Sequence, residues 1–131
     1  MAANFADVAE GVRATVAAYA QALDDGRIEE LLETFCPDAT CRIPGLGTRQ
    51  GTEALREAFS GLKRQRRQRH LVVNTLVTQW GGTEAKAVSD LVVLVQEESG
   101  WKVEIVGRYL DTLRLHDGRW RFHERVAEFV R

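Results

Sequence analysis

The segment from His70 to Val130 has the pattern of four consecutive β-strands. It begins with "HLVVNTLVTQW" (70–80), continues through "AKAVSDLVVLVQ" (85–96) and "WKVEIVGRYLDTLRL" (101–115), and ends with "RWRFHERVAEFV" (119–130). All four are rich in valine, leucine and aromatic residues and contain period-two stretches, which is typical of strands. The polar segments "GGTE", "EESG" and "HDG" that separate them are typical of tight turns. The second half of the chain is therefore predicted to be an antiparallel meander.

The first half of the chain has helical periodicity instead. Apolar residues recur every three or four positions from Val8 to Leu23, which predicts an amphipathic helix over residues 4–23. Gly26 is suited to cap the C-terminus of this helix. Between Gly26 and Thr52 we expect a second short helix and a short strand within "ATCRIPGLGTRQG" (39–51). The second helix is expected to point Ile28, Leu31, Leu32 and Phe35 inward and to end at Pro37. Thr52 is expected to cap a third helix.

This order of elements predicts an α+β fold. Three N-terminal helices followed by strands are expected to pack on one face of a curled, mostly antiparallel sheet, which forms a cone. A polar group that points into such a cone would meet a largely apolar cavity. Since the chain shows no repeat, linker or low-complexity segment, we expect residues 1–131 to form a single domain.

Composition and charge favour some classes of partner over others. The chain has 18 Lys+Arg against 19 Asp+Glu, so the basic run "KRQRRQR" (63–69) is a local feature. It contains no aromatic residue that could stack on bases, so a nucleic-acid site is not expected. We expect a solvated rim, with a rim that attracts anionic substrates or a partner as the alternative. The start of the chain lacks the pattern of a signal peptide, and no apolar stretch approaches the ~18 residues of a membrane helix. A cytoplasmic protein without a membrane partner is expected.

Cys36 and Cys41 are the two cysteines of the chain. Neither has a histidine nearby in the sequence to complete a zinc set, so free thiols and no metal are expected.

His70 and two aspartates are the first candidates for chemistry. His70 opens the first long strand, and Asp24 and Asp25 follow the first helix, where a carboxylate opposes the helix dipole and favours a partner. A protonated histidine is an obvious partner. Period two would put Asn74 on the face of His70, but both faces of this strand are apolar, so the pattern leaves open which face is inside.

Other polar residues occupy apolar segments. Tyr19 lies on the apolar stripe of the first helix, where its hydroxyl needs a hydrogen-bond partner. Asp90 lies within a Val/Leu strand, so it must face outward or be paired, and Arg108 could be its partner. Arg125 lies on the last strand, where an arginine is usually at the edge or surface.

In combination, four segments of the chain resemble the SnoaL-like branch of the nuclear-transport-factor-2-like superfamily. They are "YAQALDDGRIEELLETFCPDATCRI" (19–43), "GTEALREAF" (51–59), "RHLVVN" (69–74) and "GRYLDTLRLHDGRWRFHERV" (107–126). The resemblance covers nearly the whole chain. It implies the cone fold and a homo-oligomer, dimer or trimer.

Within this branch the pattern is similar to that of scytalone dehydratase and bile-acid 7α-dehydratase type enzymes, which use an Asp–His dyad. The aspartate of the dyad follows a tyrosine by five residues in the bile-acid enzyme, so the resemblance assigns it to Asp24, five residues after Tyr19, rather than to Asp25. The histidine of the dyad opens a strand, so the resemblance assigns it to His70. The turn "DGRW" places the cavity arginine of the family at Arg125. The resemblance further implies a substrate-binding set made of Asn74, Asp90, Arg108, Tyr109 and Phe129.

Three differences from related enzymes limit the activities that the resemblance implies. Hexachlorocyclohexane dehydrochlorinase, another enzyme of this branch with the dyad, has a lysine where this chain has Ala22, which argues against that substrate. Scytalone dehydratase has a second histidine where this chain has Val106. Ketosteroid isomerases carry their catalytic base on the strand after "DAT". The corresponding segment of this chain, "CRIPG" (41–45), has no carboxylate, so the usual ketosteroid isomerase mechanism is not expected.

The resemblance therefore implies a cofactor-free lyase (dehydratase) or isomerase that acts on a small, mostly apolar substrate, polycyclic or polyketide-like. His70 would be the general base, Asp24 would orient it, and Arg125 or Tyr19 would bind the developing oxyanion. The alternative is a non-catalytic small-molecule-binding or assembly subunit of the same fold. An open cavity with Asp24 against His70 would favour catalysis, and a filled cavity would favour the alternative.

Overall fold

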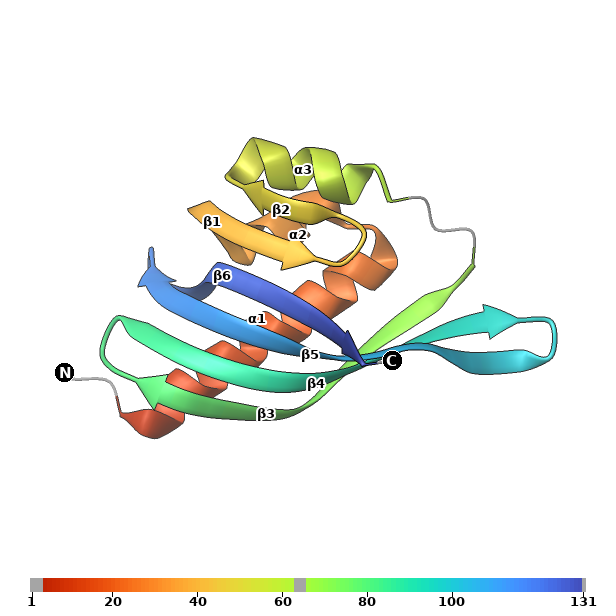
Figure 1. Ribbon diagram of the computed structural model, residues 1–131. Helices are drawn as coiled ribbons and strands as arrows, with labels where there is room; N and C mark the ends of the chain where they lie inside the picture. The colour runs from red at the N-terminus through yellow and green to blue at the C-terminus, as the bar shows by residue number, and fades with distance from the viewer. Residues whose placement is uncertain (1–3, 63–65, 131) are drawn as a thin grey trace.

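The computed structural model describes residues 4–62 and 66–130 and has an α+β fold (Figure 1). Within these residues, the helices are α1 (Phe5–Asp25), α2 (Ile28–Glu33) and α3 (Thr52–Ser60). The strands are β1 (Phe35–Ile43), β2 (Gly47–Gln50), β3 (Gln68–Trp80), β4 (Glu84–Glu97), β5 (Gly100–His116) and β6 (Arg119–Val130). They form one sheet in the order β2-β1-β6-β5-β4-β3. The sheet is curled but unclosed, and it confirms the predicted fold class and the meander of the last four strands.

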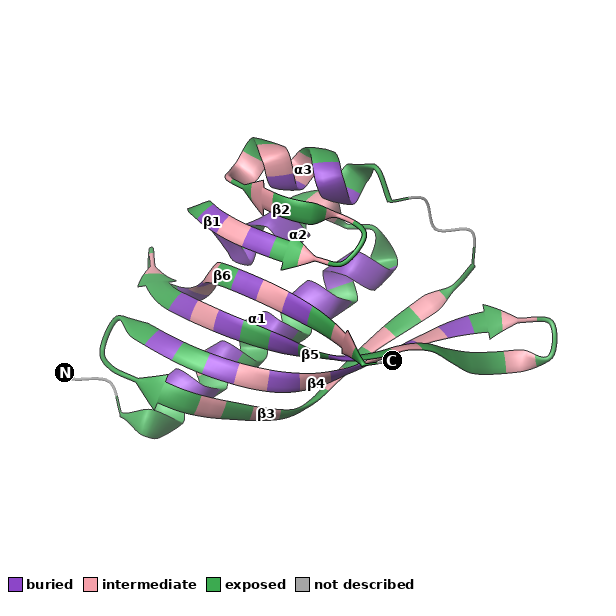
Figure 2. Ribbon diagram, viewed as in Figure 1, coloured by how far each residue is buried: buried purple, intermediate pink, exposed green. Residues whose placement is uncertain are grey.

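Helix α1 buries the apolar stripe that the sequence predicts. Val8, Val12 and Val16 are at most 3% exposed, and they pack against the concave face of the sheet (Figures 1 and 2). Gly26 adopts the left-handed conformation (φ 71°) and caps the helix, as predicted. The helix extends to Asp25, so Asp24 belongs to its last turn.

Two predicted element boundaries are wrong. Helix α2 ends at Glu33, and Phe35 and Pro37 lie in β1. The chain leaves the helix early because the Phe122 N–H of β6 binds the carbonyl of Thr34 at 2.8 Å and draws β1 into the sheet. Pro37 is accommodated there because the pairing of β1 with β6 is irregular between Phe35 and Thr40. The N-cap of α3 is Gly51, and Thr52 is the first helical residue.

A bulge in β3 reverses the predicted faces of that strand. Asn74 has φ 55°, and the pairing with β4 shifts between Val73 and Leu76. Before the bulge, His70 and Val72 are partly buried, as period two predicts; beyond it, Val77 takes the inner face and Leu76 is 66% exposed. Asn74 is thereby turned away from the face of His70.

Gly11 lies where α1 crosses Trp120 of β6. A Cβ atom at this position would overlap the Trp120 ring. Alanine ordinarily stabilises a helix by about 1 kcal/mol over glycine. Here we expect Gly11→Ala to destabilise the protein by about 1–3 kcal/mol, because the overlap with Trp120 costs more than alanine gains in helix propensity. Urea unfolding measures this, with exposed Ala14→Gly as the control for propensity alone. A stabilised Gly11→Ala variant would show that the helix and Trp120 separate at little cost.

The basic run is only partly within the described residues, since residues 63–65 lie outside them. Arg66 forms ion pairs with Glu97 (3.0 Å) and Glu104 (2.6 Å). These exposed pairs agree with a solvated rim. Among the described helices, none is long and apolar enough to cross a membrane.

Candidate active site

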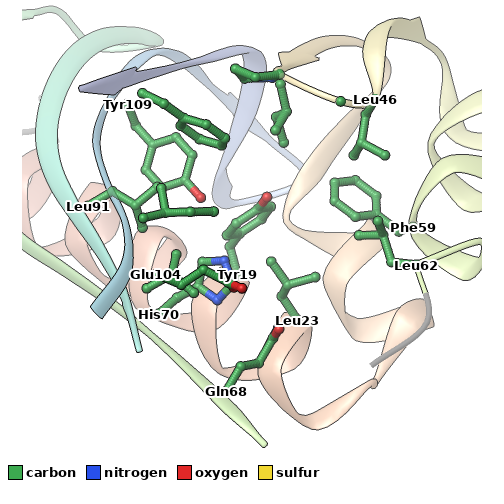
Figure 3. Close-up of a pocket in the computed structure, with 16 residues that line it drawn as sticks. Tyr19, Leu23, Leu46, Phe59, Leu62, Gln68, His70, Leu91, Glu104 and Tyr109 are labelled. Carbon is green, nitrogen blue, oxygen red and sulfur yellow. The ribbon is translucent and has the colours of Figure 1, made fainter. Parts of the chain in front are cut away.

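A cavity of about 280 Å³ lies between α1, α3 and the concave face of the sheet (Figure 3). Its wall is mostly apolar, with contributions from Leu23 of α1, Phe59 of α3 and Leu91 of β4. The loop that joins β1 to β2 adds Leu46. The polar side chains at the cavity are Tyr19, Gln68, His70, Glu104 and Tyr109. Such a pocket suits a small, largely apolar ligand held by a few polar groups.

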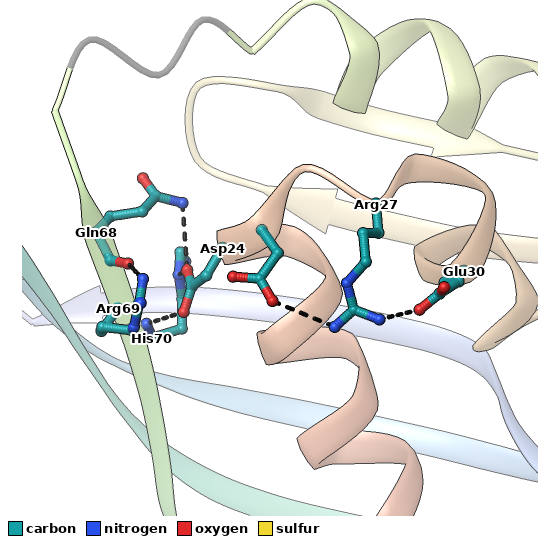
Figure 4. A network of polar contacts seen from close by, with 7 residues as sticks. Asp24, Arg27, Glu30, Gln68, Arg69 and His70 are labelled. Atoms are coloured by element: carbon teal, nitrogen blue, oxygen red, sulfur yellow. Dashed lines mark hydrogen bonds and ion pairs between the residues drawn. The ribbon is translucent and has the colours of Figure 1, made fainter.

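Asp24 and His70 meet at the edge of this cavity (Figure 4). A carboxylate oxygen of Asp24 lies 2.6 Å from Nδ1 of His70, and the other oxygen accepts the backbone N–H of His70 at 2.7 Å. The predicted contact between the two residues is therefore confirmed. The Asp24 residue is 5% exposed and the His70 side chain 12% exposed, so water has little access to the pair.

The double contact fixes the orientation of the imidazole. Asp24 holds the backbone and the ring of His70 together, and Gln68 adds a hydrogen bond from Nε2 to the same carboxylate at 3.3 Å. A carboxylate on Nδ1 favours the proton on that nitrogen and leaves Nε2 able to accept one. His70 lines the cavity, so the pair has the arrangement of a base and its orienting group.

Two tyrosines border the cavity, and Arg125 lies behind them. The Arg125 guanidinium carbon is 3.4 Å from the centre of the Tyr109 ring and 4.2 Å from that of Tyr19. Burial raises the pKa of both tyrosines, and that of Tyr19 rises well above its usual value. Both hydroxyls therefore stay protonated and can donate hydrogen bonds. The two side chains also interact with each other, and this contact with Tyr109 raises the pKa of Tyr19 further.

Arg125 is fully buried and does not line the cavity, where the family resemblance implied it to be. Its Nε lies 3.1 Å from a carboxylate oxygen of Asp111, which is 4% exposed. The contact is an ion pair without hydrogen-bond alignment, because the guanidinium is oriented against the aromatic rings. Burial raises the pKa of Asp111 to about 6, against the opposing effect of Arg125. In this structure Arg125 touches Tyr19 and Tyr109 from behind rather than the cavity itself.

Asn74, Asp90 and Arg108 form a separate cluster and do not line this cavity, whereas the resemblance implied a position at the substrate. Asp90 accepts hydrogen bonds from Asn74 (3.0 Å) and from Arg108 (3.0 and 3.2 Å), which confirms the suggested Asp90–Arg108 pair. The Asn74 hydrogen bond and then Arg108 lower the pKa of Asp90. The bulge at Asn74 turns that side chain away from the face of His70. Tyr109 and Phe129, in contrast, line the cavity as predicted.

Sequence reasoning missed Gln68, Glu104 and Leu46. Gln68 could have been found, because it lies two residues before His70 on the same strand face. Glu104 and Leu46 carry no such signal, since they reach the cavity through the pairing of β5 and the turn after β1.

The curled sheet and the three helices packed against it define an α+β domain of the nuclear-transport-factor-2-like kind. The family model of the SnoaL-like domain matches residues 6–126, and the chain belongs to this family. No curated protein matches the chain significantly in sequence.

Solved structures agree with the assignment. A protein of unknown function from Mycobacterium tuberculosis is 29% identical, with a TM-score of 0.84 over 92% of this chain and 75% of that one. A protein from Catenulispora acidiphila, solved in complex with S-DNPA, is 26% identical, with a TM-score of 0.84 over 95% and 94% of the two chains. A protein provisionally named scytalone dehydratase from Novosphingobium aromaticivorans is 22% identical, with a TM-score of 0.81 over 93% and 83%. At that identity it shows the fold alone.

Proposed function

We propose that this protein is a lyase of the dehydratase type, or an isomerase, that removes a proton from a small, mostly apolar substrate. The observation that carries the proposal is the 2.6 Å contact between Asp24 and Nδ1 of His70 at the edge of an apolar cavity. A polycyclic or polyketide-like molecule with a carbonyl group is the class of substrate that fits.

His70 acts as the general base. Its Nε2 takes a proton from the carbon next to the substrate carbonyl, and the electrons of the broken C–H bond form an enolate. In a dehydration the enolate electrons then expel a β-hydroxyl group as water, with the proton returned by the imidazolium. In an isomerisation the imidazolium returns the proton to a different carbon. Neither reaction uses a cofactor.

Asp24 and Tyr19 support the two charges that form. Asp24 stabilises the imidazolium through Nδ1 and keeps the ring turned toward the substrate. Tyr19 donates its hydroxyl to the enolate oxygen, a role that suits a protonated phenol at the cavity wall. Arg125 and Asp111 act from behind, by holding Tyr19 and Tyr109 in place.

The relatives are in keeping with this proposal. The Catenulispora protein was solved with a small molecule, and the Novosphingobium protein carries a provisional dehydratase name. The Catenulispora complex is in keeping with a fold that holds a ligand.

A second candidate is a non-catalytic binding or assembly subunit. The observation that favours it is a set of exposed apolar residues on the strands, namely Leu71, Val73, Val103, Val106, Leu110 and Val130. Exposed apolar surface of this kind suits contact with another chain. A β subunit of an aromatic-ring-hydroxylating dioxygenase shares the fold at 24% identity. In this reading, and also in the homo-oligomer that we propose, the cone is one unit of a larger assembly.

Filling the cavity entrance tests whether the cavity is the functional site. Leu46 lies in the turn between β1 and β2 and is only partly buried, so Leu46→Trp is expected to fold normally and to obstruct the cavity. We expect aromatic ketones that raise the melting temperature of the wild type to lose this effect in Leu46→Trp. Leu76→Trp, on an exposed part of β3, is the matched control and should bind as the wild type does. Equal binding by Leu46→Trp would place the ligand elsewhere.

A further inference from the structure

Cys36, Asp38 and His123 come together where β1 and β6 run parallel. Phe35 pairs with Phe122, so the residues that follow in each strand, Cys36 and His123, lie side by side. The Cys36 thiol sulfur, a carboxylate oxygen of Asp38 and a ring nitrogen of His123 all lie within 4.8 Å of one another. The sequence gives no hint of this cluster, because the histidine near Cys36 comes from the other end of the chain.

We propose that these three side chains form a binding site for a zinc-like divalent cation. Thiolate, imidazole and carboxylate together are a donor set that zinc and cobalt prefer, whereas calcium and magnesium prefer oxygen alone. Three protein ligands would leave one coordination position for water. The site is distinct from the cavity, since none of its three residues lines it.

The environment of each ligand supports the proposal. Nδ1 of His123 is buried and, among the described residues, has no hydrogen-bond partner; it lies 3.8 Å from Asp38, beyond hydrogen-bond range. Cys36 is 4% exposed and is not in a disulfide, and its thiol makes a long contact of 3.8 Å with the Arg121 carbonyl. The Asp38 side chain is 68% exposed, which leaves a path for an ion and freedom to close on it.

The geometry needs a small contraction. Tetrahedral zinc with bonds of about 2.0–2.3 Å places its ligand atoms about 3.3–3.8 Å apart. The carboxylate of Asp38 can supply most of this movement because it is exposed. Binding replaces the thiol proton of Cys36, which leaves to solvent as the sulfur–metal bond forms.

Nearby charges set the expected strength of the site. Burial, and then Asp38, raise the pKa of the Cys36 thiol, whereas Arg114 and Arg121 lower it. The two arginines favour the thiolate but repel a cation. The site should therefore bind more weakly than a structural zinc site with four protein ligands. A bound ion would tie β1 to β6 at the irregular part of their pairing and so stabilise the strand that leads into the cavity turn.

Cobalt absorption tests the proposal directly, because a cobalt–thiolate bond gives an ultraviolet charge-transfer band. Untagged protein, kept reduced with a non-thiol reductant, is titrated with Co²⁺. We expect one ion per chain and a charge-transfer band. Cys36→Ser should abolish the band. His123→Gln should weaken binding by about 100-fold or more, because loss of a metal ligand costs more than loss of a residue that only hydrogen-bonds to a ligand, which costs about 10–100-fold.

The chain supplies a matched control for the cysteine and for the histidine. Cys41→Ser removes the other buried cysteine and should keep the band. His116→Gln removes a histidine that lies 3.4 Å from Asp117 on a different turn, and it should bind as the wild type does. His123→Gln keeps the test valid if Cys36→Ser folds poorly. Absence of a charge-transfer band at excess Co²⁺, or a band that survives in a folded Cys36→Ser or His123→Gln protein, would overturn the proposal.

Discussion

Replacing Arg125 with methionine is expected to lower the free energy of unfolding at pH 8 by about 3–5 kcal/mol. Arg125 is fully buried, and Asp111 is its ion-pair partner at 3.1 Å. Without the guanidinium, the buried Asp111 carboxylate is left charged without its ion-pair partner, or it must take up a proton against the bulk pH. Urea unfolding of the wild type and Arg125→Met measures the loss.

The double variant Arg125→Met/Asp111→Asn separates charge from packing. Replacing both members of a buried ion pair with uncharged groups is often close to neutral, whereas removing one is costly. We therefore expect the double variant to recover most of the stability lost in Arg125→Met. If the double variant is as unstable as the single one, the loss comes from the packing of Tyr19, Tyr109 and Phe122 around Arg125, and the charge account is wrong.

The same pair predicts a pH dependence. Burial raises the pKa of Asp111 to about 6, so the folded protein keeps this proton at pH values where the unfolded chain has lost it. The contribution of Asp111 to the free energy of unfolding therefore falls as pH rises from about 4, its pKa in the unfolded chain, to about 6, its pKa in the folded protein. The total decrease is about 3 kcal/mol. Asp111→Asn removes this contribution. The stability of the wild type relative to Asp111→Asn should decline across that window.

Replacing His70 with alanine is expected to reduce turnover by about 10² to 10⁴-fold, the usual contribution of a general base. The affinity for a bound ligand should change little, because most of the cavity wall is apolar. Single-turnover kinetics would measure the loss of turnover separately from binding. The substrate would be sought among the aromatic ketones that raise the melting temperature of the wild type.

Asp24 and Asp25 form a matched pair for the same experiment. Asp24→Asn should impair turnover, because it weakens the hold on Nδ1 of His70 and the stabilisation of the imidazolium. Asp25→Asn changes the neighbouring carboxylate, which is exposed and paired with Arg27 at 3.3 Å, and should leave turnover unchanged. Equal effects of the two substitutions would remove Asp24 from the mechanism.

The sequence predicted the parts of this protein that depend on local pattern. The buried stripe of α1, the four strands after His70 and the Gly26 cap follow from periodicity and turn chemistry. The Asp24–His70 contact followed from spacing together with the family resemblance, since composition alone left Asp24 and Asp25 equivalent.

What escaped prediction depends on long-range pairing and on single backbone angles. The positive φ of Asn74 creates the bulge that turns this residue away from His70, and alternation cannot foresee it. The parallel pairing of β1 with β6 carries Pro37 into a strand and brings His123 to Cys36. The depth of Arg125 depends on three aromatic rings from different elements, which a strand pattern does not reveal.

Hydrogen–deuterium exchange at carbon tests the role of His70 most directly, because it reports proton abstraction without requiring the full reaction. Aromatic ketones that bind the cavity are incubated with the protein in D₂O, and loss of the proton next to the carbonyl is followed by NMR. The account predicts that the wild type exchanges this proton in at least one bound ketone, and that His70→Ala binds the same ketone equally well but exchanges it at least about 100-fold more slowly. Exchange at the wild-type rate in His70→Ala would contradict the account.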